Sequence, residues 1–140
     1  MLFRSDGRWE KDVFDAIQFV DVLLPNEQEA CRLAGCEDSI TAAEKLSKKV
    51  PRLVIKRGAK GVLARKGKES FEAGAPKIDA VDTIGAGDSF DAGFLHQFIR
   101  GAKIEDCLRY GNLAGALSTT RQGGTEAFRD AEHRTAFLNR

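Results

Sequence analysis

Residues 82–93 read Asp-Thr-Ile-Gly-Ala-Gly-Asp-Ser-Phe-Asp-Ala-Gly, and this stretch decides how the rest of the chain is arranged. The short run before it, residues 78–81, is expected to be extended. Apolar residues follow at positions 90, 94, 95, 98 and 99, which is the spacing of one helical face. A small-residue loop that opens a helix leaves backbone N–H groups unpaired, at the end where the helix dipole adds positive charge. The stretch therefore predicts an anion-binding loop.

Asp88 lies in the first turn of this predicted helix, where a carboxylate would repel a bound phosphate. The carboxylate becomes useful if it takes the proton from a hydroxyl group that attacks that phosphate. An acidic residue in the first turn also stabilises a helix by itself. The loop alone leaves both interpretations of Asp88 open.

The same residues match every fixed position of the pattern D-T-x-G-A-G-D-x-F-x-x-G, and the chain thereby resembles the ribokinase-like (PfkB-type) carbohydrate kinases. The resemblance implies transfer of the γ-phosphoryl group of ATP to a hydroxyl of a sugar or sugar-like small molecule. It implies that Asp88 is the catalytic base. It also implies an anion hole made by the main-chain amides of Gly85, Ala86, Gly87 and Asp88.

Two further segments resemble motifs of the same family. Asn26 and Glu29 match an N-x-x-E motif that helps to place Mg²⁺ and phosphate, although their spacing is also that of a helix capping box. Lys56, Gly58 and Gly61 match a K-x-G-x-x-G segment at the nucleotide, where a lysine offers charge to phosphate and glycines admit close approach of the main chain. A tight connection between strands would explain the same glycines.

The second long helix expected after the signature has an unusually small face at Gly111, Ala114, Gly115 and Ser118, which suits either close helix packing or a flat ligand. The resemblance places the adenine base near Asn112, Ala116 and Thr119, with Asn112 favoured because it can form hydrogen bonds. Relatives also bind a monovalent cation such as K⁺ beside the signature, which implies a role for Asp82 and Ile84.

Alternating strands and helices favour an α/β protein. We expect a single domain over residues 1–140 with a Rossmann-like three-layer α/β/α fold, a mainly parallel sheet and one β-hairpin, as in part of a ribokinase-like kinase. The expected strands are residues 20–24 and 53–55, and the hairpin covers residues 62–72 with its turn at 66–68. The expected helices are residues 13–20, 26–34, 41–49 (with Thr41 and Glu44 as a capping pair and Pro51 as its stop), 90–99, 104–120 and 129–138.

Composition excludes several classes of partner. The 22 basic and 21 acidic residues give a net charge of +1, which provides no basic field for nucleic acid or a membrane surface. Three cysteines and two distant histidines suggest neither a disulfide framework nor a zinc site, which fits a reducing cytoplasm. We read the three cysteines as core or neutral positions.

The resemblance covers only the C-terminal half of a ribokinase-like kinase. The half that usually holds the sugar has no match here, so the chain is expected to be a fragment, a split subunit or a truncated product. A homodimer or the missing N-terminal half would then cover its apolar edge. The alternative to a kinase is a non-catalytic nucleotide-binding or interaction module, and the sequence does not decide which hydroxyl compound is the acceptor.

Overall fold

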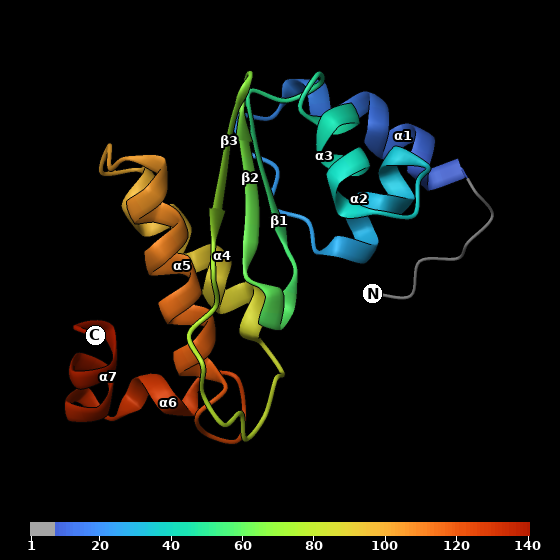
Figure 1. The fold of residues 1–140 in the computed structure, drawn as a ribbon. Coiled ribbons are helices and arrows are strands. Elements are labelled where there is room, and N and C mark those ends of the chain that lie inside the picture. Colours follow the sequence, from blue (N-terminus) through green and yellow to red (C-terminus); the bar gives the residue numbers. More distant parts are fainter. Residues whose placement is uncertain (1–7) are drawn as a thin grey trace. The chain divides into compact units, whose positions relative to one another are not determined.

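The structure, a computed structural model, describes residues 8–140 (Figure 1). They form two compact units, and each unit is made from two separate segments of the chain. Unit 1 contains the described residues up to 57 and residues 63–71, and unit 2 contains residues 58–62 and 72–140. Within residues 8–140, no helix combines the length and the apolar composition that crossing a bilayer requires.

Unit 1 carries three helices and most of a small sheet. Its helices are α1 (Arg8–Ala16), α2 (Glu27–Ala34) and α3 (Ser39–Leu46), with the 3₁₀ turn η1 (Ile17–Phe19) after α1. The sheet has the order β1-β2-β3, with β1 at Arg52–Lys56, β2 at Val62–Lys66 and β3 at Glu69–Ala73. The last part of β3 and the first residue of β2 belong to unit 2. The predicted hairpin is confirmed, with Gly67 in the left-handed region at its turn.

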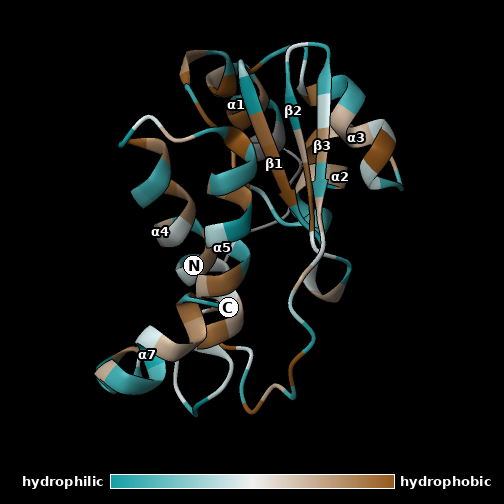
Figure 2. Ribbon diagram, turned by 60° about the vertical axis from the view of Figure 1, so that its left-hand side comes forward, coloured by the Kyte–Doolittle hydropathy of each residue, from teal (hydrophilic) through white to brown (hydrophobic). Residues whose placement is uncertain are grey.

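The core of unit 1 lies between its helices and β1. Leu53, Val54 and Ile55 are completely buried, as expected of a strand covered on both faces. Ala42, Ala43 and Leu46 of α3 join the same apolar cluster. Figure 2 shows the middle of β1 in the brown of hydrophobic residues.

A segment before α2 pairs with β1 in the parallel sense, but only through isolated bridges. Leu23 pairs with Leu53, and Asn26 pairs with Lys56. The N–H of Lys56 donates to the carbonyl of Pro25 at 2.9 Å, but Pro25 has no N–H to return. The predicted strand at residues 20–24 is therefore wrong in extent, because only Leu23 of this run pairs with β1 and Pro25 just beyond it cannot donate to a ladder.

Helix α3 differs from its prediction at both ends. Its N-cap is Asp38, whose carboxylate accepts the N–H of Thr41 at 2.8 Å, so the expected capping pair Thr41 and Glu44 is wrong. The helix stops at Leu46, whose carbonyl accepts the N–H groups of Lys49 and Val50, well before Pro51. The residue before a proline avoids the helical conformation, so the chain leaves the helix earlier than the proline itself.

Apart from the first residue of β2 and the last part of β3, unit 2 consists of helices and connecting loops. It contains η2 (Gly58–Lys60), α4 (Ala86–Phe98), α5 (Ile104–Ser118), α6 (Glu126–Arg129) and α7 (Ala131–Leu138). Residues 78–81 form no regular strand. Asp130 separates α6 from α7 and caps α7 by accepting the N–H of His133 at 3.0 Å, so the predicted terminal helix at residues 129–138 is divided.

Close packing of α4 on α5 uses the small face that the sequence predicts on α5. A Cβ placed on Gly93 would lie 2.7 Å from the Cβ of Ala114 and 3.0 Å from the carbonyl of Tyr110. A Cβ on Gly111 would lie 2.9 Å from the ring of Phe90. These glycines allow the two helices to approach each other, so the small face serves helix packing rather than a flat ligand.

Candidate functional site

Asp82 joins the beginning of the signature loop to the loop that follows α5. Its Oδ1 accepts the N–H of Ile84 at 3.0 Å, and its Oδ2 accepts the N–H of Gly123 at 3.0 Å. The carbonyl of Thr119 accepts the N–H groups of Val81 at 2.7 Å and Asp82 at 3.2 Å. Both carboxylate oxygens of Asp82 therefore accept main-chain hydrogen bonds, one from the loop before α4 and one from the loop after α5. We call this pair of hydrogen bonds to Asp82 the clasp.

The hydrogen bond from Ile84 and then that from Gly123 lower the pKa of the Asp82 carboxyl group below its usual value. Both donors favour the ionised form. A carboxyl group with a lowered folded-state pKa stabilises the fold fully above the unfolded-state pKa of about 3.9. This stabilisation is lost as the pH falls through the lowered value.

We therefore expect Asp82→Asn to remove part of the acid dependence of stability. The parent chain should lose stability steeply below about pH 4, whereas the variant should be less stable at neutral pH and should lose less on acidification. Urea unfolding at a series of pH values measures both slopes. Parallel pH curves for the two proteins would show that the clasp does not contribute through its charge.

The helix α4 begins directly after the small-residue loop of the signature. Gly85 is the N-cap in the left-handed region, with φ 77° and ψ 2°, and no side chain caps this helix. The N–H of Ala86 donates to the carbonyl of Thr83 at 3.3 Å, and the carbonyl of Gly85 accepts from Ser89. Among the described residues, no acceptor is recorded for the N–H groups of Gly87 and Asp88. Asp88 itself is exposed in the same turn.

The loop after α5 packs against the N-terminal turn of α4. A Cβ on Gly85 would lie 3.1 Å from the Cα of Gly124, and a Cβ on Gly124 would lie 3.1 Å from the carbonyl oxygen of Ile84. A side chain at either position would therefore push the two loops apart by a few tenths of an ångström. Gly123 and Gly124 were not predicted as site residues, although two adjacent glycines are a visible signal in the sequence.

A second candidate site in unit 2 lies at the end of β3, where Gly61 and Asn112 contact the main chain. A Cβ on Gly61 would lie 2.1 Å from the carbonyl oxygen of Ala73 and 2.8 Å from the Cα of Gly74. From α5, the side-chain amide of Asn112 donates to the carbonyls of Ala73 at 3.3 Å and Gly74 at 3.0 Å. Asn112 is buried, and both of its N–H donors are directed at the main chain, so a base could use only its amide oxygen.

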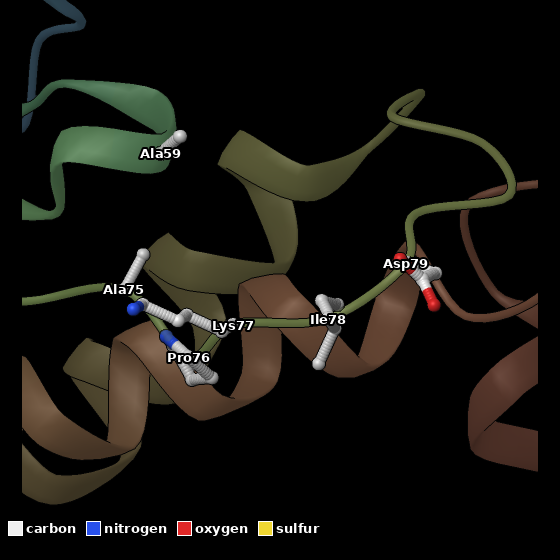
Figure 3. Close-up of a pocket in the computed structure, with 6 residues that line it drawn as sticks. All are labelled: Ala59, Ala75, Pro76, Lys77, Ile78 and Asp79. Carbon is white, nitrogen blue, oxygen red and sulfur yellow. The ribbon is translucent and has the colours of Figure 1, made fainter.

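A pocket of about 400 Å³ opens beside this assembly (Figure 3). Ala59 of η2 lies opposite the extended segment that follows β3. The lining residues are Ala59, Ala75, Pro76, Lys77, Ile78 and Asp79. The walls combine apolar side chains with one cation and one carboxylate, so a ligand there would meet both apolar surface and charge.

The other two residues expected near the base have structural roles in this region. The hydroxyl of Thr119 donates to the carbonyl of Ala116 at 2.7 Å, while its own carbonyl holds the signature loop. Ala116 packs against the apolar cluster of Leu113, Leu117, Ala127 and Phe137. Neither residue lines the pocket.

The remaining predicted site residues lie in unit 1. Asn26 accepts the N–H of Glu29 at 2.8 Å, and Glu29 Oε2 accepts the N–H of Asn26 at 2.9 Å, which confirms the predicted capping box. The bridge between Asn26 and Lys56 brings the two predicted motifs side by side. Asn26 and Glu29 are both exposed, so the capping geometry leaves the outer carboxylate oxygen accessible.

Metal ligands are sparse in the part of the chain that the structure describes. No group of three or more His, Cys, Asp or Glu side chains is placed to hold a metal ion there. His133 instead pairs with the hydroxyl of Thr120 at 2.9 Å. A bound Mg²⁺ would therefore depend on one or two carboxylates together with phosphate and water oxygens, which is the usual coordination of this ion in phosphoryl-transfer sites.

Comparison with protein families gives one match over most of the chain. Residues 3–131 match the model of the pfkB family of carbohydrate kinases. A ribokinase of Haemophilus influenzae is 32% identical over 131 residues, which cover 89% of this chain and 42% of that protein. The chain thus spans less than half the length of the curated relatives it matches.

Solved structures of sugar kinases have the same fold. The ribokinase of Thermotoga maritima superposes with a TM-score of 0.80 at 34% identity, over 91% of this chain and 45% of the other. A double mutant of the fructokinase of Vibrio cholerae O395, with fructose, ADP and a potassium ion bound, gives a TM-score of 0.82 at 26% identity, over 94% and 45% of the two chains. These similarities confirm the expected α/β class and the partial ribokinase-like fold.

Proposed function

Because this chain belongs to the pfkB family of carbohydrate kinases, we propose that it is the nucleotide-binding half of an enzyme that transfers the γ-phosphoryl group of ATP to a hydroxyl of a sugar-like molecule. The observation that carries the proposal is the uncapped N-terminus of α4, where main-chain amides and an exposed Asp88 occupy the same turn. Helix amides bind an anion, and the carboxylate provides the base that a phosphoryl acceptor needs.

Each group in the first turn of α4 has a separate role in the proposed transfer. The acceptor oxygen attacks the γ-phosphorus, and the bond to the β–γ bridging oxygen breaks to release ADP. Asp88 takes the hydroxyl proton late in this displacement, as the new bond forms. The amides of Gly85, Gly87 and Asp88 stabilise the charge on the phosphoryl oxygens, with Ala86 contributing if its long bond to Thr83 opens.

The pocket beside β3 is suited to the nucleotide. Gly58 begins η2 and Gly61 follows it, and Ala59 of η2 lines the pocket. Asn112 fixes the main chain directly before Ala75. We assign the base and ribose to this pocket, with Lys77 as a cation that sequence reasoning did not single out. Ala116 and Thr119 support the surrounding loops and are assigned no direct contact with the base.

Two ions fit the residues of this chain. Glu29 presents a carboxylate oxygen beyond its capping bond, and Lys56 lies at the adjacent bridge, so we assign both, with Asn26, to Mg²⁺ and phosphate. Mg²⁺ supplies charge neutralisation on the phosphates when bound. Asp82 and the carbonyl of Ile84 lie at the clasp between two loops, and we assign them to a monovalent cation such as the potassium ion found in the similar fructokinase.

A matched pair of variants distinguishes the two roles considered for Asn26, which are helix capping and the placement of Mg²⁺ and phosphate. Asn26 caps α2 and Asp38 caps α3, each by accepting an N–H at 2.8 Å, so Asn26→Ala and Asp38→Ala should each cost about 1 kcal/mol of stability. Only Asn26→Ala should also raise the KM for Mg-ATP in the intact enzyme, by roughly tenfold if about 1.4 kcal/mol of binding is lost. Equal KM values would assign Asn26 to helix capping alone.

Titration calorimetry with Mg-ATP, together with a coupled assay of ADP release across a panel of sugars, nucleosides and sugar acids, tests the proposed reaction. Binding and turnover with one acceptor class support it. Binding without turnover favours the alternative, a nucleotide-binding module, which the length of the chain relative to its relatives supports. No binding of nucleotide would overturn both.

The chain also exposes apolar side chains that a partner would cover. Leu95 and Ile99 are one turn apart on α4 and are 40% and 79% exposed. We propose that either the N-terminal half of a longer protein or a second copy of the chain covers them.

A further inference from the structure

Cys31 and Cys36 lie on the two sides of the turn that ends α2. The N–H of Cys36 donates to the carbonyl of Cys31 at 3.1 Å, and the N–H of Gly35 donates to the carbonyl of Arg32 at 3.2 Å. Gly35 is in the left-handed region, with φ 60° and ψ 48°. These features define a Schellman motif, in which the side chains that flank the turn commonly contact each other. In this chain both of those side chains are thiols.

The two thiols are neighbours and are partly accessible. The Sγ of Cys36 donates to the carbonyl of Asp38 at 3.5 Å, and the Cys36 thiol is near enough to add to the effect of burial in raising the pKa of the Cys31 thiol. Both side chains are only partly buried, against the apolar cluster of unit 1. A disulfide requires Cα atoms about 4.4–6.8 Å apart, and the main-chain hydrogen bond between these residues holds the two segments adjacent. Cys107 differs because it is buried in α5.

We propose that Cys31 and Cys36 form a reversible dithiol–disulfide site that reacts with low-molecular-weight disulfides such as oxidised glutathione. One protein thiolate attacks a sulfur of glutathione disulfide, which forms a mixed disulfide and releases one glutathione thiolate. The neighbouring thiolate then attacks the protein sulfur and releases the second glutathione. The protein gives up two electrons, and the two thiol protons pass to the released glutathiones, so two thiols become one disulfide.

The second step, in which the neighbouring thiolate displaces glutathione, is fast because the two thiols are held close together. Because the Schellman turn holds the resolving thiol beside the first one, closure of the ring is intramolecular and should outrun attack by a second glutathione. Burial, followed by the neighbouring Cys36 thiol and Glu27, raises the pKa of the Cys31 thiol above its ordinary value. The thiolate is therefore scarce at neutral pH, and the reaction should accelerate as the pH rises. This behaviour fits a slow response to oxidising conditions rather than redox catalysis.

Peptide mapping tests the site directly. The chain is incubated with oxidised glutathione, free thiols are alkylated, and the product is digested with trypsin. Cleavage after Arg32 places Cys31 in the peptide of residues 12–32 and Cys36 in that of residues 33–45. We expect these two peptides to be joined and to separate on reduction, while Cys107 is recovered unmodified by glutathione.

Single variants show whether the pair acts together. In Cys31→Ser or Cys36→Ser, the remaining thiol should keep its glutathione, because no neighbour displaces it, and Cys107→Ser should still form the joined peptides. Persistent glutathione adducts on the parent chain, disulfides between chains, or unreacted Cys31 and Cys36 would each overturn the proposal. The map of the parent chain decides the matter even if a variant fails to fold.

Discussion

Asp88→Asn in the intact enzyme should lower kcat by about a hundredfold or more, because general-base assistance contributes roughly 10²–10⁴ to such reactions. An asparagine has nearly the same shape but cannot accept the acceptor's proton. The amides of the α4 N-terminus remain in place, so the affinity for Mg-ATP should stay within a few-fold of the parent value. The effect should therefore fall on kcat, and calorimetry alongside steady-state kinetics separates the two quantities.

A matched carboxylate controls for the effect on the helix. Asp106 lies in the first turn of α5, is exposed like Asp88, and belongs to the same unit. Removing the charge from either residue should cost a similar 0.3–1 kcal/mol or so of helix stabilisation. Only Asp88→Asn should lower turnover. If both variants keep turnover within a few-fold of the parent, Asp88 merely stabilises its helix and the base has to be sought elsewhere.

Local signals in the sequence predicted much of what lies close along the chain. The capping box of Asn26 and Glu29 was predicted from spacing alone, because both partners lie within one helical turn. The helix that opens after the small-residue loop was predicted in the same way, and its N-cap is Gly85. The cap of α3 was wrong because Thr41 and Glu44 also fit a capping pattern, while Asp38, three residues earlier, is the residue that accepts the N–H of Thr41.

Contacts between distant segments left no comparable signal. The clasp of Asp82 joins it to Gly123, and Asn112 binds the carbonyls of Ala73 and Gly74. In each case the partner is a main-chain group, which every residue possesses, so residue type does not reveal it. Asn112 was predicted as a contact of the base from the family resemblance and from its ability to form hydrogen bonds, and in the structure its side-chain amide donates to the two carbonyls at the end of β3.

Gly61→Ala should cost about 2–5 kcal/mol of stability, the largest effect that we expect from adding a single methyl group to a described glycine of this chain. Two effects add together. The φ angle of Gly61 is 80°, a conformation that costs an L-residue about 1–2 kcal/mol. The new Cβ would also lie 2.1 Å from the carbonyl oxygen of Ala73. Overpacking against main chain adds about 1–3 kcal/mol more. The strand cannot yield freely, because Asn112 holds the same carbonyl.

Gly101→Ala is the matched control for this clash. Gly101 has φ 76° in the same unit, but a Cβ there would meet nothing within 4 Å. It should therefore show only the backbone cost, about 1–2 kcal/mol, in urea unfolding followed by circular dichroism. Gly61→Ala should in addition weaken binding of Mg-ATP, because the displaced segment leads into Ala75 and the pocket. Equal losses of stability in the two variants would mean that the end of β3 can move aside, and that Gly61 is needed for its backbone conformation alone.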